Sequence, residues 1–119
     1  MEPQSLIINI TSEQPAKLHE FYRQTLGLPE RHDMGEMALD VAGAALIFDS
    51  HSEVQGRAKE PYRYLVNIMV PDLGAEQERL DAAGVTCIRR QGREPWGGVI
   101  STFVDPDGNY IQLMEYKPE

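Results

Sequence analysis

The feature that most constrains this chain is an internal repeat. The segment LIINITS, which begins at Leu6, aligns with YLVNIMV, which begins at Tyr64, and this alignment places Asn9 on Asn67. A sequence that recurs in this way indicates a structural unit that occurs twice and buries its apolar surface against its copy. The chain has 119 residues, so we expect both copies to form one domain.

Each copy continues with a helix-like segment. Apolar residues recur at helical spacing over residues 15–26 in the first copy and over residues 73–83 in the second. Polar caps precede the two segments, and glycines suited to the left-handed residue that closes a helix follow them: Ser12, Gly27, Asp72 and Gly84.

Three strand-like segments separated by turns follow each helix. They cover residues 30–34, 37–40 and 44–50 in the first copy, and 86–91, 98–104 and 110–116 in the second. The sequence therefore predicts an α+β fold of two βαβββ modules, which form a curved eight-stranded sheet or barrel with two main helices. We expect the modules to span about residues 1–52 and 62–119, joined by a polar linker over about 53–61.

Composition and charge exclude several classes of protein. The net charge of −8 opposes binding to nucleic acid, which needs a basic surface. The longest apolar run, residues 41–48, is too short to cross a membrane. The N-terminal segment MEPQSLIINITSEQ lacks the pattern of a secretory signal, and the single cysteine, Cys87, cannot form an intrachain disulfide. We expect a cytoplasmic protein without membrane or nucleic-acid partners.

Three longer stretches carry a resemblance to a known family. They are KLHEFYRQTLGL at residues 17–28, VPDLGAEQERLDAAGV at residues 70–85, and EPWGGVISTFVDPDGNYIQLMEY at residues 94–116. In this order and spacing they resemble the vicinal oxygen chelate superfamily of glyoxalases, bleomycin-resistance proteins and extradiol dioxygenases. The resemblance covers nearly the whole chain, so residues 1–119 are interpreted as one domain of that kind.

The resemblance also implies four metal-ligand positions. Metal-dependent members use a histidine in the first strand and a glutamate in the last strand of each module. These positions fall on Ile7 and Leu65, and on Ile47 and Gln112. None of these side chains suits a divalent ion, so we expect no cofactor and disfavour glyoxalase I and extradiol dioxygenase chemistry of the usual kind. Whether the chain is an enzyme stays open.

A rearranged site is the alternative. Asp49, His51 and Glu53 alternate in DSHSE, and only a tight loop could gather them around one divalent metal, since alternate residues of a strand lie about 6.6 Å apart. A solvated loop is the other interpretation of this segment. His32 and Asp49 are candidates for a general base.

Strand alternation sorts the residues that line a cavity, because side chains two apart share a face. Since the resemblance places the ligand positions on the cavity side, we expect that side to bear the residues of the same parity: Ile7, Asn9, Thr11, Ala45, Ile47, Asp49, Leu65, Asn67, Met69, Tyr110, Gln112 and Met114. Apolar walls with a few hydrogen-bonding groups are typical of small-molecule sites. Trp96, in the EPWGG loop, either borders the ligand mouth, as the resemblance implies, or plugs the barrel end. A filled core whose polar groups satisfy one another is the alternative to a pocket.

Three functions are compatible with these residues. The first is a metal-free protein, similar to the bleomycin-resistance branch, that binds a small molecule. The second is a lyase, isomerase or dioxygenase-type enzyme with a rearranged site, and the third is a regulatory or partner-binding module with a vestigial pocket. The resemblance also implies a homodimer, and the sequence leaves open whether the modules pair within one chain or between two.

Overall fold

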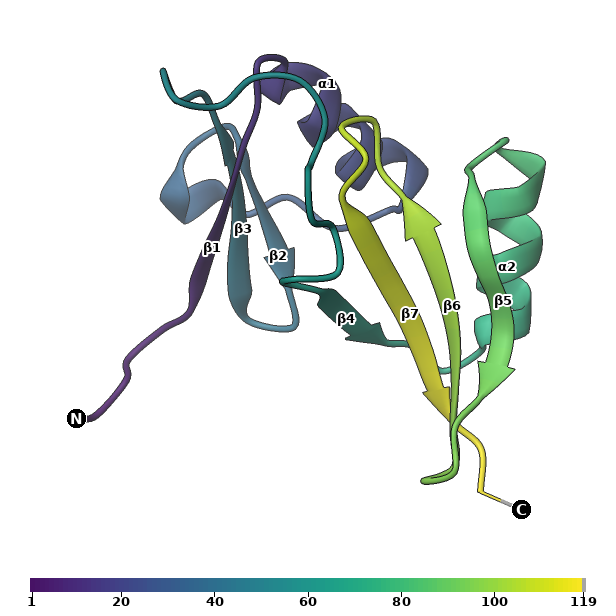
Figure 1. The fold of residues 1–119 in the computed structure, drawn as a ribbon. Coiled ribbons are helices and arrows are strands. Elements are labelled where there is room, and N and C mark those ends of the chain that lie inside the picture. Colours follow the sequence, from purple (N-terminus) through teal and green to yellow (C-terminus); the bar gives the residue numbers. More distant parts are fainter. Residues whose placement is uncertain (119) are drawn as a thin grey trace. The chain divides into compact units, whose positions relative to one another are not determined.

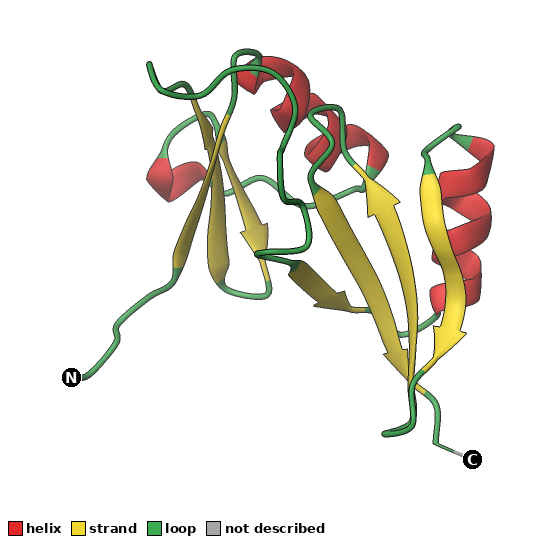
Figure 2. Ribbon diagram, in the orientation of Figure 1, coloured by secondary structure: helices red, strands yellow, loops and turns green. Residues whose placement is uncertain are grey.

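The computed structural model describes residues 1–118 and divides the chain into two compact units, Met1–Gly56 and Arg57–Glu119 (Figure 1). Both units combine helical segments with β-strands (Figure 2), which confirms the predicted α+β class. The boundary lies inside the segment predicted as a linker. Gly56 N donates to the Glu13 carboxylate in the first unit, and Ala58 N donates to the Asp107 carbonyl in the second, so each side of the boundary is attached to its own unit.

The first unit is built from three strands and helical segments. In chain order these are β1 (Ile7–Thr11), α1 (Pro15–Glu20), a π-helical turn (Phe21–Thr25), a 3-10 turn (His32–Met34), β2 (Ala38–Val41) and β3 (Ala44–Asp49). The sheet order is β1-β3-β2, with β1 parallel and β2 antiparallel to β3. Ala42 and Gly43 both have positive φ, as a two-residue hairpin between β2 and β3 requires.

The core of the first unit forms where helical side chains meet one face of its sheet. Leu39 and Leu46 lie opposite each other on β2 and β3, and both are buried. The rings of Tyr22 and Phe48 lie 5.0 Å apart. Leu18 is fully buried as well. These strand residues have the parity opposite to the one predicted to face a cavity.

The helix predicted over residues 15–26 is present but changes type along its length. After α1 the chain continues as the π-helical turn, with Leu26 N donating to the Phe21 carbonyl. Gly27 follows with φ of 87°, as the sequence predicted. Ser12 does not occupy the cap position, which is Gln14; instead its hydroxyl accepts a hydrogen bond from Gln14 N at 2.9 Å.

One predicted strand is absent from the first unit. Residues 30–34 form a single bridge, between Glu30 and Leu39, and then the 3-10 turn. The Arg31 guanidinium donates to the Asp33 carboxylate at 3.0 Å and to the Gly43 carbonyl at 2.7 Å. The local bond to Asp33 and the bond to the β2–β3 hairpin hold this segment as a turn in place of a longer ladder. The described residues therefore contain seven strands rather than eight.

The second unit contains four strands and one longer helix. They are β4 (Val66–Met69), α2 (Leu73–Ala82), β5 (Cys87–Arg93), β6 (Gly98–Val104) and β7 (Tyr110–Tyr116). The sheet order is β4-β7-β6-β5, with β4 parallel to β7 and the other pairs antiparallel. The predicted boundaries of the last two strands, residues 98–104 and 110–116, are confirmed. The strands of residues 1–118 form two hydrogen-bonded sheets, and a closed barrel stays a prediction.

Helix α2 covers one face of the second sheet. Its side chains Leu73, Gln77 and Leu80 are buried, as are Phe103 and Leu113 of the sheet. Polar groups within this layer are paired, because the Ser101 hydroxyl donates to Gln77 Oε1. The Asp72 carboxylate accepts from Ala75 N at 3.0 Å, and this confirms the predicted helix cap. The side chains of opposite parity, among them Thr102 and Gln112, lie on the other face of this sheet.

The strand register confirms the internal repeat. Asn9 lies opposite Ile47 in the first unit, and Asn67 lies opposite Gln112 in the second. In both units the first strand pairs in parallel with the last strand, and a helix lies between them in sequence. The alignment of Ile47 with Gln112, made from sequence, is thus a structural equivalence. Within residues 1–118, no helix is long and apolar enough to cross a membrane.

Candidate functional site

The cavity-facing residues predicted in the first unit share one face of its sheet. Side chains in register on neighbouring strands point to the same face, about 4.8 Å apart. The parallel register pairs three residues of β1 with three of β3: Ile7 with Ala45, Asn9 with Ile47, and Thr11 with Asp49. Asn9 and Asp49 are exposed and Ile47 is half-buried. The structure therefore brings the predicted residues of this unit together on one surface.

The predicted residues of the second unit also share a face, which we call the amide face. It is the face of the four-stranded sheet opposite α2 that bears Asn67 and Gln112, which lie side by side on β4 and β7. Met69 and Met114 form the next pair along the same strands. Tyr110 belongs to the same parity of β7, and its ring lies 4.7 Å from that of Tyr62. Leu65 immediately precedes β4.

The Gln112 side chain is fixed by a residue that the sequence did not single out. Gln112 is 8% exposed, and its Nε2 donates to the Thr102 hydroxyl at 3.0 Å. Thr102, on β6, lies directly opposite Gln112 and is also buried. One of the polar side chains predicted to line the cavity is thus hydrogen-bonded within the protein, as expected if the polar groups of a filled core satisfy one another. Because this bond uses the amide nitrogen, Gln112 Oε1 is left as an acceptor.

A second residue missed by the sequence extends the polar row to the far edge of the sheet. Arg89, on β5, lies opposite Thr102, so one row crosses all four strands: Asn67, Gln112, Thr102 and Arg89. Arg89 pairs with Glu94 at 2.7 Å. The register of β5 shifts on both sides of Arg89, and Gln91 has positive φ, so simple alternation could not assign its face. The sequence carried no signal for Thr102, because β6 is buried along almost its whole length.

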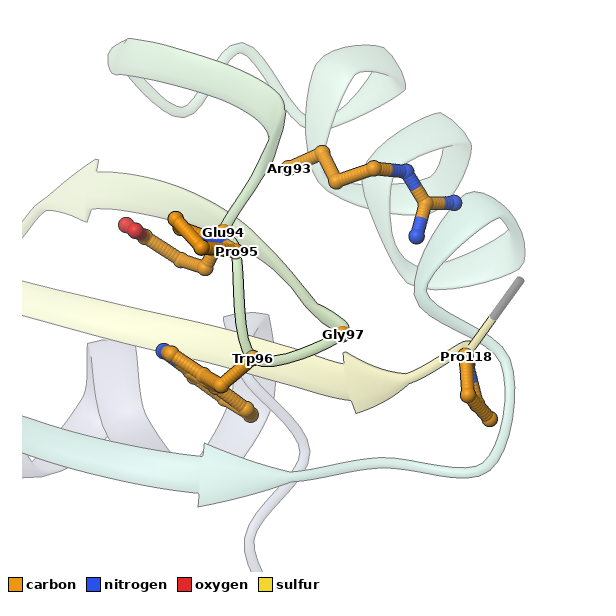
Figure 3. A pocket seen from close by; sticks show the side chains of 6 residues that line it. All are labelled: Arg93, Glu94, Pro95, Trp96, Gly97 and Pro118. Carbon is orange, nitrogen blue, oxygen red and sulfur yellow. The ribbon is translucent and has the colours of Figure 1, made fainter.

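Trp96 occupies the loop between β5 and β6, beside a surface cavity of about 500 Å³. The cavity lining comprises Arg93, Glu94, Pro95, Trp96, Gly97 and Pro118. Figure 3 shows Trp96 and Arg93 leaving this loop in different directions. The indole lies over Gly98, where a Cβ would overlap the ring, and is parallel to Tyr116 with ring centres 6.5 Å apart. Since Gly98 and Tyr116 are paired at the end of the amide face, Trp96 lies at the border of that face.

The four positions that the resemblance assigns to metal ligands hold Ile7, Ile47, Leu65 and Gln112. Among residues 1–118, no group of three or more His, Cys, Asp and Glu side chains could hold a metal ion. His51 Nδ1 instead accepts from Glu53 N at 3.0 Å, and Asp49 accepts from Ser50 N at 2.8 Å. The alternative metal site at Asp49, His51 and Glu53 stays a prediction.

The candidate general base His32 lies on the surface of the first unit. Its side chain is 86% exposed, and its nearest carboxylate is that of Glu30, at 3.9 Å. Asp33 pairs with Arg31, and this hydrogen bond lowers the pKa of the Asp33 carboxyl below its ordinary value. Asp33 is thus oriented toward a cation rather than toward the imidazole. The second candidate, Asp49, lies on the exposed part of its sheet face.

Comparisons with known proteins show the family to which the chain belongs. Residues 6–113 match the family model described as the Glyoxalase/Bleomycin resistance protein/Dioxygenase superfamily. The chain therefore belongs to this superfamily. No curated protein matches the sequence.

Solved structures with this fold come from several bacteria. TnmS3, an antibiotic binding protein from Streptomyces sp. CB03234, is 22% identical, with a TM-score of 0.73 and 98% of both chains covered. A family enzyme from Burkholderia phytofirmans PsJN is 20% identical, with a TM-score of 0.74 and coverage of 92% of this chain and 96% of that one. A superfamily member from Sphaerobacter thermophilus DSM 20745 is 20% identical, with a TM-score of 0.72 and coverage of 96% and 98%. These likenesses establish a shared fold.

Proposed function

We propose that the protein binds a flat, largely apolar small molecule on the amide face without a metal ion. The observation that carries this proposal is the buried Gln112 amide, held by Thr102 at the position that the resemblance assigns to a metal-binding glutamate. A neutral amide is a poor ligand for a divalent ion, but its oxygen is a good hydrogen-bond acceptor. The position is therefore suited to recognising a donor group of an uncharged molecule.

The surroundings of Gln112 suit an apolar ligand body. Met69 is 57% exposed beside Met114, and methionine side chains adapt to flat or irregular molecules. Asn67 is exposed next to Gln112 and offers both a donor and an acceptor. Trp96 is 53% exposed at the border of the face, where an aromatic ligand can stack. This combination of apolar contacts with a few fixed polar groups is typical of small-molecule sites.

The comparisons support the same proposal. One protein with this fold, TnmS3, is described as an antibiotic binding protein. Binding of an antibiotic is thus described for another protein with this fold, and we extend binding of a small molecule to this chain as part of the proposal.

The test uses N-phenyl-1-naphthylamine, a neutral and flat aromatic probe, and the only tryptophan as the reporter. Saturable quenching of Trp96 emission, with about one probe per chain, is expected because the ligand lies beside the indole. Met69→Glu is expected to weaken binding roughly fivefold to tenfold, because the probe must then desolvate a carboxylate.

The control is Ala75→Glu, which adds the same charge at an exposed position in the first turn of α2, on the other face of the sheet. An acidic residue is favourable at the start of a helix, so this variant is expected to fold and to bind the probe normally. Absence of saturable binding to the native protein, or equal weakening by both substitutions, contradicts the proposal.

The proposal includes a homodimer in the cytoplasm. Within the described residues, β1 and β4 are edge strands of their sheets, each with one hydrogen-bonded neighbour, and they carry the exposed apolar side chains Ile7 and Met69. Exposed edges of this kind favour association with another chain. Sedimentation equilibrium of the purified protein tests this part, and a monomer mass at micromolar concentration rejects it.

A further inference from the structure

A chain of hydrogen bonds runs from β5 across α2 and back to β5. Arg90 Nη1 donates to the Asp81 carboxylate at 2.7 Å, and Gln77 Nε2 donates to the same carboxylate at 2.9 Å. The Ser101 hydroxyl, on β6, donates to Gln77 Oε1 and accepts from Gln91 N at 3.0 Å. The chain of bonds thus starts and ends on two adjacent residues of β5.

The Gln91 end of this chain lies at a bulge. Between the pairs that it forms with Thr102 and Ile100, β5 advances by three residues while β6 advances by two. Gln91 has a φ of 45°, a conformation that residues other than glycine adopt rarely and that the surrounding structure must hold. Ser101 is fully buried, so its hydroxyl is a fixed acceptor for the Gln91 amide. The buried serine therefore holds the bulge from the side of the sheet that α2 covers.

The bulge sets the position of Arg89 on the other face of the sheet. Arg89 lies opposite Thr102, at the end of the polar row of the amide face. Its guanidinium lies against the backbone of Gly92, where a Cβ would overlap Nε and Nη2. Its Nη1 donates to Glu94 Oε1 at 2.7 Å. The guanidinium is thus held between a glycine and a carboxylate of its own chain, as expected of a residue that holds structure.

Glu94 begins the tight loop that carries Trp96 (Figure 3). Glu94 N donates to the Gly98 carbonyl at 2.7 Å, and Gly97 N donates to the Glu94 carbonyl at 3.0 Å. The indole of Trp96 lies over Gly98. The ion pair between Arg89 and Glu94 therefore ties this loop to β5, and with it the indole at the border of the amide face.

We propose that Ser101 and Gln77 are positioning residues for the binding site on the amide face. Their hydrogen bond fixes the bulge of β5, and the bulge places Arg89 where it holds Glu94. Through this ion pair, two buried side chains beneath α2 determine where the Trp96 indole lies. The inference rests on the proposed function, because the ligand of the amide face is the molecule that stacks on this indole.

The first test follows the Gln91 amide by hydrogen exchange, measured by NMR. Ser101→Ala removes the acceptor of this amide, so its exchange is expected to become roughly tenfold to a hundredfold faster, the range that corresponds to a lost bond in a buried place. The reference is Val104 N, which donates to the Thr86 carbonyl at the other end of the β5–β6 pair and is expected to change less. Equal acceleration of both amides would mean that the substitution acts only on global stability, and would overturn the inference.

The second test measures quenching of the only tryptophan by acrylamide and needs no ligand. Ser101→Ala is expected to increase the quenching constant of Trp96, because the loop is then held less firmly over Gly98. Arg89→Gln breaks the last link and is expected to increase quenching without changing exchange at Gln91. Unchanged quenching in either variant contradicts the proposal.

The matched control is Ser12→Ala, which removes another buried hydroxyl from the first unit. That hydroxyl accepts from Gln14 N at 2.9 Å, so a bond of the same kind is lost. This control is expected to keep the native exchange, quenching and affinity for N-phenyl-1-naphthylamine. Ser101→Ala is expected to weaken binding of the probe roughly twofold to tenfold, the value of one aromatic contact.

The outcomes separate the two proposals. If the native protein does not bind the probe, the proposed function fails, and the exchange and quenching data decide whether Ser101 positions the loop. If the probe binds but Ser101→Ala and Ser12→Ala weaken it equally or not at all, the positioning role fails while the proposed function stands.

Discussion

Removal of the Thr102 hydroxyl is the sharpest test of how the amide face is held. Thr102→Val keeps the shape of the side chain but leaves Gln112 Nε2 without its acceptor. Both side chains are buried, with Thr102 at 1% and Gln112 at 8% exposure. An amide donor left unsatisfied in such a place costs about 1–3 kcal/mol of unfolding free energy. For a domain of this size that corresponds to a decrease in Tm of roughly 4 °C or more.

A second substitution, at Gln112, allows the coupling energy between the Thr102 and Gln112 side chains to be measured. Gln112→Leu alone leaves the Thr102 hydroxyl unpaired, whereas the double variant Thr102→Val/Gln112→Leu replaces both partners by apolar groups. We expect the double variant to be about 1–2 kcal/mol more stable than the sum of the single effects predicts. Urea unfolding followed by far-ultraviolet circular dichroism gives the four free energies. Additivity within about 0.5 kcal/mol would refute the reasoning, because it would mean that the two side chains do not depend on each other.

Two further predictions concern groups outside the amide face. Asp72→Ala removes the side-chain cap of α2 and is expected to cost about 1 kcal/mol of stability, measured by urea unfolding, whereas Asp72→Asn retains an acceptor and is expected to cost less. The second concerns Asp33, whose pKa lies below its ordinary value of 3.8 because Arg31 donates to its ionised form. The contribution of this pair to stability is therefore present above pH 3.8 and is lost as the pH falls through the lowered pKa. A carbon-detected NMR titration is expected to give a higher Asp33 pKa in Arg31→Gln, and an unchanged value would contradict the assigned cause.

The sequence predicted correctly those elements whose local sequence pattern favours the same structure as their packing in the fold. The last two strands have the predicted boundaries because each is flanked by turn residues and is rich in β-branched or aromatic side chains. The placement of Asn67 and Gln112 on one face of the sheet followed from the expected parity of the strands. Where the two copies differ, the prediction was less successful. In residues 30–34 the Arg31 side chain bonds to Asp33 and to the Gly43 carbonyl, and the segment forms a turn instead of the expected ladder.

Residues of the candidate site could be predicted on strands with regular alternation of polar and apolar side chains. On the other strands the prediction missed residues of the site. Strand β6 is buried along almost its whole length, so its polarity pattern gave no indication that Thr102 faces Gln112. Strand β5 contains register shifts, and a shift reverses the face on which each later side chain lies. Arg89 could therefore not be assigned to the amide face from the sequence CIRRQGR. Its position depends on backbone geometry that only the paired strand reveals.

The pairing of first and last strands has a consequence for the history of the chain. In each unit β1 or β4 is hydrogen-bonded to the closing strand of its own unit, and among the described residues neither hydrogen-bonded sheet takes a strand from the other unit. Each sheet therefore takes all of its hydrogen-bonded strands from one continuous segment of the chain. A gene segment that encodes it can be copied in tandem without changing any partner of any strand. After such a copying event each half is free to diverge in its side chains, and the contrast between Ile47 and Gln112 at one shared position is the kind of difference that this freedom allows.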